Sequence, residues 1–212
     1  MPGIPCAMPS GRRRRCRHAS DSNRRYRERG YPLARAWLPQ QEIADGLVRI
    51  EVLEGRYGEV RINNPAGLRA AALAPLAALR PGEVVRAGPL ERGLLLTRDL
   101  AGVEVRSTLQ PGASVGTTDL AVDLLPGRFF SGGLEADNFG NRYTGEYRLS
   151  GRLEVNNPLG LGDQLSLRLL ASDAAQLYGR LAWEGAAGPW GTRFGIGHAQ
   201  MRYELDKDFA VL

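Results

Sequence analysis

The sequence predicts a small mixed α+β domain followed by long antiparallel β-strands. Two observations carry this prediction. Between residues 57 and 126, strand and helix periodicities succeed one another in the order β-α-α-β-β, with turn residues at each change. From Gly127 onward the pattern contains strands only, each about ten residues long, and their polar faces carry full charges.

The elements of the mixed domain follow from local signals. They are expected to be a strand over Glu59–Ile62, a helical segment over Gly67–Leu79, a second helix with Pro89 at its first position, and strands over Val103–Leu109 and Thr117–Leu125. Pro75 interrupts the first helical segment, so a kink or two short pieces are expected there. The two last strands are close enough in sequence to form a hairpin.

The pattern of residues 23–56 repeats only the last helix and the two strands of the β-α-α-β-β order. A charged helix over Asn23–Arg29 is stopped by Gly30, and a strand is expected over Tyr31–Leu38. Apolar residues then alternate with charged ones from Val48 to Val52, which is typical of a half-buried strand. The segment therefore resembles the second half of a domain of the same kind.

Two of the C-terminal strands alternate clearly between apolar and polar residues, and the other three alternate more weakly. In the clearest of them, Leu149 and Leu153 take one face while Arg148 and Arg152 take the other. A soluble sandwich would also alternate, but the strand length and the charged faces favour a transmembrane barrel, which has a wet interior. Five strands are predicted: Phe130–Asn138, Thr144–Asn156, Asp163–Ala171, Gln176–Glu184 and Thr192–Met201.

Residues 1–22 form an Arg-rich tail that is expected to be disordered or to be extraneous leader sequence. The run Arg12–Arg15 could contact nucleic acid or anionic lipid. Residues 1–30 hold a net charge of +7, against +5 for the whole chain, so the remainder is slightly acidic and no nucleic-acid partner is expected. Cys6 and Cys16 lie in the same segment, which excludes a disulfide framework for the rest of the chain.

One pattern of catalytic type occurs, around Ser114 in the G-x-S-x-G match Gly112–Gly116. A nucleophile elbow needs a strand before the serine and a helix after it, whereas an alternating strand follows here. Gly160-Leu161-Gly162 lacks the third glycine of a dinucleotide loop. We therefore expect a hairpin turn at Ser114 and no catalytic residue, cofactor or metal site.

Three stretches match one known family. Gly30–Ile62 resembles the junction between two POTRA domains, and Pro89–Leu124 is similar to the second helix and closing hairpin of such a domain. Gly132–Ser172 resembles the opening strands of a barrel, including an Asn-Pro-Leu-Gly-x-Gly-Asp turn at Asn157–Asp163. On these motifs the chain resembles the two-partner secretion outer-membrane translocators, the hemolysin activator family of the ShlB/FhaC/HecB type.

The resemblance implies α+β POTRA domains in the periplasm that lead into an antiparallel β-barrel in the outer membrane. It implies two partners, a secreted exoprotein of hemolysin or hemagglutinin type and outer-membrane lipid. The expected organisation is a tail, the C-terminal part of a first POTRA domain, a second POTRA domain and the first barrel strands: residues 1–22, 23–56, 57–126 and 127–212. Family members also have a signal peptide, a plug helix and further barrel strands, so we expect a fragment.

The predicted strand order leaves Val103–Leu109 at the edge of the second POTRA sheet. An extended exoprotein segment could pair with such an edge, with Glu104, Arg106 and Thr108 facing outward. The alternatives are a plain structural strand, a free-standing periplasmic POTRA-type binding module and, less well supported, a nucleic-acid binder using the basic tail. The candidate exoprotein-binding residues are Val103, Glu104, Val105, Arg106, Ser107, Thr108 and Leu109.

Overall fold

The structure, a computed structural model, describes residues 21–41, 49–174 and 176–203. It divides into two compact units that alternate along the sequence. Within the described residues, no helix is long and apolar enough to cross a membrane. One unit comprises Met1–Ile62, Ala78–Gly93 and Ser107–Val122, and the other comprises Asn63–Ala77, Leu94–Arg106 and Asp123–Leu212.

The first elements are a helix over residues 21–28 and a two-stranded antiparallel sheet of β1 (Arg35–Trp37) and β2 (Glu51–Leu53). The Asn23 side chain accepts the N–H of Ala36 and donates to its carbonyl, which holds the helix against β1. The predicted order of helix, strand and strand is confirmed, with shorter strands. The predictions for residues 1–20 and for Val48 lie outside the described residues.

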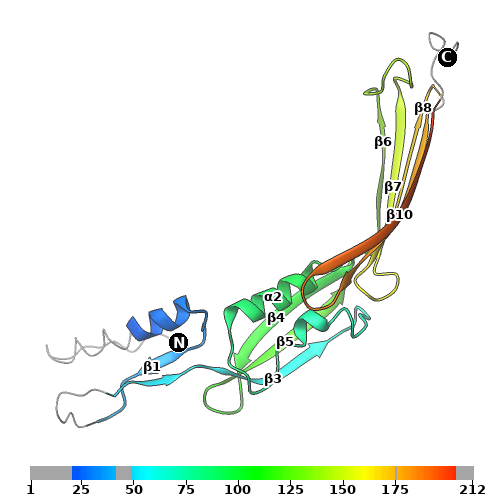
Figure 1. Cartoon of the computed structure of the whole chain (residues 1–212). Helices are drawn as coiled ribbons and strands as arrows, with labels where there is room; N and C mark the ends of the chain where they lie inside the picture. The colour runs from blue at the N-terminus through cyan, green and yellow to red at the C-terminus, as the bar shows by residue number, and fades with distance from the viewer. Residues whose placement is uncertain (1–20, 42–48, 175, 204–212) are drawn as a thin grey trace. The chain divides into compact units, whose positions relative to one another are not determined.

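A three-stranded sheet follows, in the order β3-β5-β4 (Figure 1). Its strands are β3 (Arg56–Asn63), β4 (Val103–Pro111) and β5 (Thr117–Pro126). The expected hairpin and the expected central position of its second strand are both confirmed. The strand predicted over Glu59–Ile62 extends further at both ends.

The helices differ more from prediction. The helix α2 (Ala87–Arg98) begins two residues before Pro89, whereas Pro89 was expected at its first position. The helix predicted over Gly67–Leu79 is wrong: apart from the 3₁₀ helix η1 (Ala74–Leu76), the segment is a series of turns. Pro75 has no N–H and cannot continue an α-helix from preceding residues, and the N–H of Arg69 donates to Gly160 O instead.

Each unit contains its own share of the buried apolar side chains. Full burial of a leucine or valine side chain contributes about 1.5–3 kcal/mol, so these clusters dominate the local stability. In the first unit the buried residues include Tyr57, Leu79, Val85, Leu120 and Val122. In the second they include Leu68, Leu76, Leu100, Val103 and Leu124, together with the fully buried Thr97.

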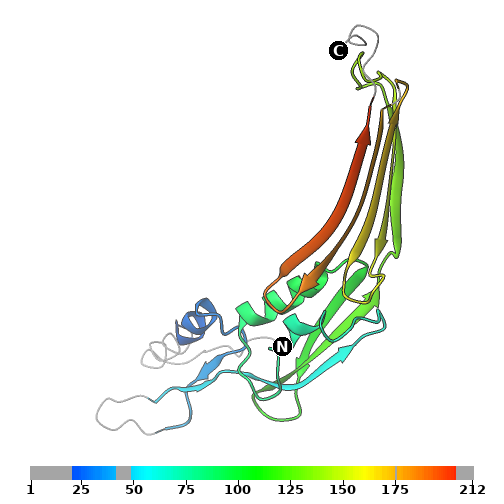
Figure 2. The same cartoon turned by 45° about the vertical axis from the view of Figure 1, so that its right-hand side comes forward.

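The remaining strands form a curved antiparallel sheet in simple sequence order, from β6 to β10 (Figure 2). All five predicted strands are confirmed, with ends shifted by a few residues. Their bounds are β6 (Phe130–Asp137), β7 (Arg148–Asn156), β8 (Gln164–Ser172), β9 (Leu177–Ala187) and β10 (Thr192–Arg202).

The register puts apolar and polar side chains of this sheet on opposite faces. Leu153 pairs with Leu167, and Leu167 pairs with Leu181, so the three central strands contribute leucine to one row of the sheet. Leu153 is 45% exposed although it lies within the sheet. Arg152, one residue away, projects from the other face. The exposed apolar face is suited to lipid, and the polar face is suited to water.

We predict that the two faces differ in their reaction with a water-soluble maleimide. In a background with Cys6 and Cys16 replaced by serine, Arg152→Cys should react at least about tenfold faster than Leu153→Cys, because a thiol in lipid stays protonated and unexposed to the reagent. Labelling rates in isolated outer membranes provide the measurement. Val115→Cys, at a residue 97% exposed in a hairpin loop, sets the upper limit. Equal rates at 152 and 153 would contradict the assignment of the faces.

Candidate functional site

The strand β4 is an edge of the β3-β5-β4 sheet, and two hydrogen bonds fix its register on β5. The N–H of Gly127 donates to Gly102 O over 2.9 Å, and the N–H of Gly112 donates to Thr117 O over 3.0 Å. Ten residues separate these two pairs on each strand, so the hairpin has a single register without a bulge.

This register determines which backbone groups of β4 are available. Even-numbered residues direct their N–H and C=O groups toward β5, because the paired Gly102 and Gly112 are even-numbered. The N–H groups of Val103, Val105, Ser107 and Leu109 therefore point away from the sheet. Pro111 belongs to the same set, and proline is tolerated at an edge because no ladder donor is needed there.

The side chains of β4 change in burial along the strand. Val103 is buried and Val105 is half-buried, whereas every residue from Arg106 to Pro111 is exposed. Glu104, Arg106 and Thr108 are exposed as predicted, but so are Ser107 and Leu109. The outer half of β4 is thus accessible on both faces as well as along its backbone, and all seven candidate residues lie on this one strand.

The opposite edge strand, β3, is partly covered by the segment that precedes α2. The N–H of Tyr57 donates to Glu83 O, the N–H of Gly82 donates to Tyr57 O, and the N–H of Val85 donates to Gly55 O. Further along, the N–H of Glu59 donates to a carboxylate oxygen of β5, Asp119 Oδ1. The first half of β3 therefore has little backbone free for another strand.

A pocket of about 490 Å³ lies beside this covered part of β3, lined by Tyr57, Leu79, Glu83 and Pro89 among others. The Tyr57 hydroxyl is buried and has no hydrogen-bond partner among the described residues. Burial, and secondarily the nearby Glu83 carboxylate, raise the pKa of Tyr57, so the hydroxyl stays protonated. No sequence signal beyond an aromatic residue at a core position indicated this pocket.

At the other end of β3, Glu59 and Arg61 form an exposed ion pair. The hydrogen bond from Arg61 holds the pKa of the Glu59 carboxyl below its usual value. Exposed pairs of this kind contribute little to stability, so this pair is a feature of the surface and not of the core.

Ser114 does not stand at a nucleophile elbow. It lies in the loop of the β4–β5 hairpin, where its N–H donates to Thr117 Oγ1 and its carbonyl accepts the Thr117 hydroxyl over 2.7 Å. Strand β5 follows immediately, as predicted. Within the described residues, no group of three or more His, Cys, Asp or Glu side chains is arranged to hold a metal ion.

Asp163 is a feature that sequence reasoning missed. Its side chain is completely buried at the turn between β7 and β8, although it is a carboxylate. One oxygen accepts the N–H groups of Leu159 and Leu161, each over 3.2 Å, and the other accepts the indole N–H of Trp183 over 2.7 Å. These three donors compensate for the loss of water. The only sequence signal was an aspartate directly after a Gly-x-Gly turn.

The same turn contacts the end of the POTRA-like domain within one compact unit. Asn157 donates from its side chain to Ala66 O, and its own Oδ1 accepts the N–H of Gly162. The N–H of Arg69 donates to Gly160 O over 2.7 Å. A Cβ at Gly162 would come within 2.6 Å of the Leu100 side chain, so glycine is required for this close approach.

The β9–β10 hairpin, at the same end of the long sheet, is held in a similar way. In the strand that follows it, Arg193 donates to Asp99 O at the end of α2 and pairs with Glu184 at 3.0 Å. Gly191 lies so close to Leu96 that a Cβ there would come within 2.6 Å of the leucine. The β7–β8 and β9–β10 hairpins, both at this end of the sheet, therefore pack by backbone and side-chain contacts on other segments of the same compact unit.

Comparison with known proteins agrees with this architecture. A family model described as "POTRA domain, ShlB-type" matches residues 17–55, and one described as "Haemolysin secretion/activation protein ShlB/FhaC/HecB" matches residues 116–191. The chain belongs to the ShlB/FhaC/HecB family. Membership places its long strands in the outer membrane and its POTRA segments in the periplasm.

Individual relatives are transporters. The Heme/hemopexin transporter protein HuxB of Haemophilus influenzae is 34% identical over 197 residues, 92% of this chain and 35% of the relative. The outer membrane transporter CdiB of Dickeya dadantii is 29% identical, over 74% of this chain and 29% of the relative. The solved structure of CdiB from Escherichia coli superposes with a TM-score of 0.72 at 25% identity, covering 92% of this chain and 37% of that one. The chain thus spans about a third of the length of these relatives.

We predict that Asp163→Ala will destabilise the junction between the turn and the small domain. Three partly buried donors would lose their acceptor, and each loss costs about 1–3 kcal/mol, so the free energy of unfolding should fall by about 3 kcal/mol or more. The midpoint of thermal unfolding, followed by Trp183 fluorescence in a Trp37→Phe, Trp190→Phe background, provides the measurement.

Two further variants make this prediction specific. Asp163→Asn should lose less stability, because one amide oxygen still accepts the two backbone N–H groups, but it should shift the Trp183 emission. Asp173→Ala removes an exposed carboxylate from a loop at the far end of β8 and should change neither quantity. Equal unfolding midpoints for Asp163→Ala and Asp173→Ala would refute the role given to Asp163.

Proposed function

We propose that this chain acts within an outer-membrane translocator, where the POTRA edge strand β4 binds a secreted exoprotein that then passes through the barrel. The observation that supports this most directly is the exposed backbone of β4 in a sheet of the matching family. The exoprotein would be of the hemolysin or hemagglutinin class, and the role would be transport without catalysis. Residues 23–56, 57–126 and 127–212 would form the end of a first POTRA domain, a second one and barrel strands.

Strand addition is the interaction that this geometry supports. Four residues of β4 direct N–H groups outward from consecutive ladder positions: Val103, Val105, Ser107 and Leu109. An extended polypeptide can satisfy these groups without any particular side-chain sequence. Such recognition suits a substrate that arrives unfolded, because its backbone groups are still unpaired.

The two edges of the sheet are not equivalent, and this favours β4 over β3. The backbone of β3 around Tyr57 already bonds to Glu83 and Gly82, and Arg56 forms an isolated antiparallel bridge with Val84. No comparable segment pairs with β4 among the described strands. A further strand, supplied by the exoprotein, can therefore be added at β4 without displacing existing hydrogen bonds.

A free-standing periplasmic binding module is the second candidate. It would use the same edge but would have no need of the long strands. The sheet β6–β10 favours the translocator instead. One of its faces exposes many large apolar side chains, and water-soluble proteins rarely expose a contiguous apolar face.

The decisive experiment replaces an outward N–H of β4 without changing the fold. Ser107→Pro removes a donor that points away from β5, so the sheet should remain intact while binding weakens about tenfold, equivalent to ~1.4 kcal/mol. The matched control Ser107→Ala keeps the N–H and should bind normally. Binding of the unfolded cognate exoprotein is measured by surface plasmon resonance on the purified protein.

A neighbouring variant separates loss of binding from loss of structure. Thr108→Pro removes an N–H that points toward β5 and should disturb the sheet, which circular dichroism would show. If Ser107→Pro retains the native spectrum and also binds the exoprotein as tightly as the wild type, β4 is not the binding edge.

A further inference from the structure

We infer that a row of three arginines on the polar face of the long sheet is a binding site for acidic segments of the exported polypeptide. The register places these residues side by side on three neighbouring strands. Arg152 of β7 pairs with Arg168 of β8, and Arg168 pairs with Arg180 of β9. Directly paired residues project from the same face of a sheet, so the three guanidinium groups form one row.

This arrangement is electrostatically unfavourable unless an anion binds to it. Like charges directly opposite one another destabilise a sheet, and here two such pairs share their central member, Arg168. All three side chains are exposed. The described residues supply none of them with a carboxylate at ion-pair distance.

Other arginines on the same face are neutralised, which makes the row distinctive. Arg148 bonds to Asp137 on the neighbouring strand at 2.8 Å, and Arg193 pairs with Glu184 at 3.0 Å. In each pair the arginine and the carboxylate lie on neighbouring strands, close enough for a direct contact. Among the described residues, the arginines near the two ends of the sheet therefore have carboxylate partners, whereas the central row forms no ion pair.

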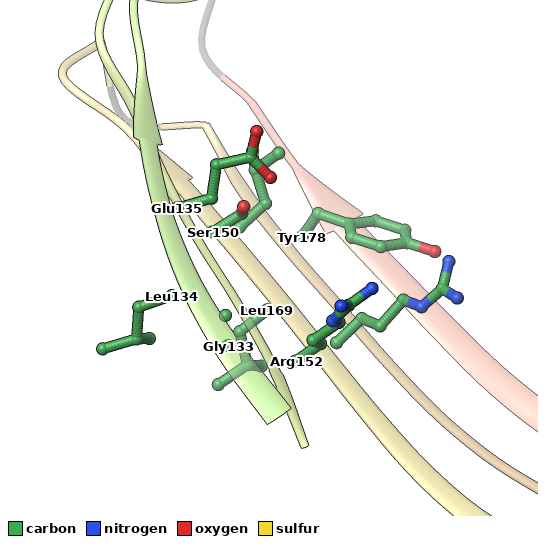
Figure 3. A pocket seen from close by; sticks show the side chains of 10 residues that line it. Gly133, Leu134, Glu135, Ser150, Arg152, Leu169 and Tyr178 are labelled. Carbon is green, nitrogen blue, oxygen red and sulfur yellow. The ribbon is translucent and has the colours of Figure 1, made fainter. Parts of the chain in front are cut away.

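The surface around the row is shaped to receive a chain. Arg152 and Arg168 line a depression of about 400 Å³, together with Ser150, Tyr178 and one carboxylate, Glu135, which forms no ion pair with either arginine. Figure 3 shows Arg152 and Tyr178 projecting from the same side of the sheet, while Leu134 projects from the other side. The hydroxyl groups of Ser150 and Tyr178 add donors beside the guanidinium groups.

Charge and spacing identify the ligand class. Arginine binds carboxylates through paired N–H donors, and a row of three fits a segment with more than one acidic side chain. Strands lie about 4.8 Å apart, so the row spans about 10 Å. In an extended polypeptide, side chains at i and i+2 share one face about 7 Å apart, so alternating acidic residues fit within the row. The choice of exported polypeptide as ligand rests on the translocation role proposed above.

The test uses a peptide and requires no transport. A fluorescein-labelled peptide with glutamate at every second position, separated by serine and threonine, is titrated with the protein purified from outer membranes in detergent. Arg168→Gln should weaken its binding at least fivefold. Arg148→Gln changes the net charge equally, but at an arginine that already has a partner, and should change the affinity less than twofold. A peptide with glutamine in place of glutamate should bind at least tenfold more weakly than the acidic one.

Each alternative result overturns the inference. Equal affinity for the two peptides would mean that the row does not select acidic segments, with carboxylates elsewhere in the protein neutralising it. An equal loss in Arg168→Gln and Arg148→Gln would show a general charge effect. Arg168→Lys, which keeps the charge, should recover most of the affinity, and complete loss in this variant would also overturn the inference, because the positive charge of the row would then not account for binding. If Ser107→Pro leaves exoprotein binding intact while the peptide results hold, the proposed function of β4 fails and this inference does not.

Discussion

The buried carboxylate of Asp163 is the interaction on which the arrangement around the start of the long sheet depends. A charge without exposure is stable only where donors replace water, and the turn supplies two backbone N–H groups while Trp183 supplies a third. These bonds fix the conformation of residues 157–163. Because this conformation is fixed, Gly162 lies against Leu100 and Gly160 lies against Gly67, both so closely that a Cβ would crowd the neighbour.

The second organising constraint is the pairing of backbone groups at sheet edges. Every strand that is not paired on one side exposes a row of donors and acceptors, and proteins usually cover such rows. Here one edge of the POTRA sheet is half covered by residues 82–85, while β4 remains open and ends in Pro111. The difference between the two edges is the physical reason for proposing exoprotein binding at β4.

The long sheet shows how charge is distributed when one face is wet. Its apolar face consists largely of leucine, with the row Leu153, Leu167 and Leu181 as an example. On the polar face the arginines divide into two kinds, those bonded to a carboxylate on the neighbouring strand and those lined up with other arginines. Structural ion pairs and a row of arginines without ion pairs among the described residues therefore coexist on a single sheet.

The sequence by itself determined the class of fold, the presence and order of the long strands and the separation of their faces, because alternation with a period of two is a local property of the chain. It also indicated β4 as an edge, since a hairpin preceded by one further strand leaves few possible strand orders. Tertiary structure decided the rest. The segment around Pro75 became turns because Arg69 bonds to Gly160, which lies far along the chain. The burial of Asp163 and the alignment of Arg152, Arg168 and Arg180 likewise depend on which residues the turns bring opposite one another, and no local pattern specifies that.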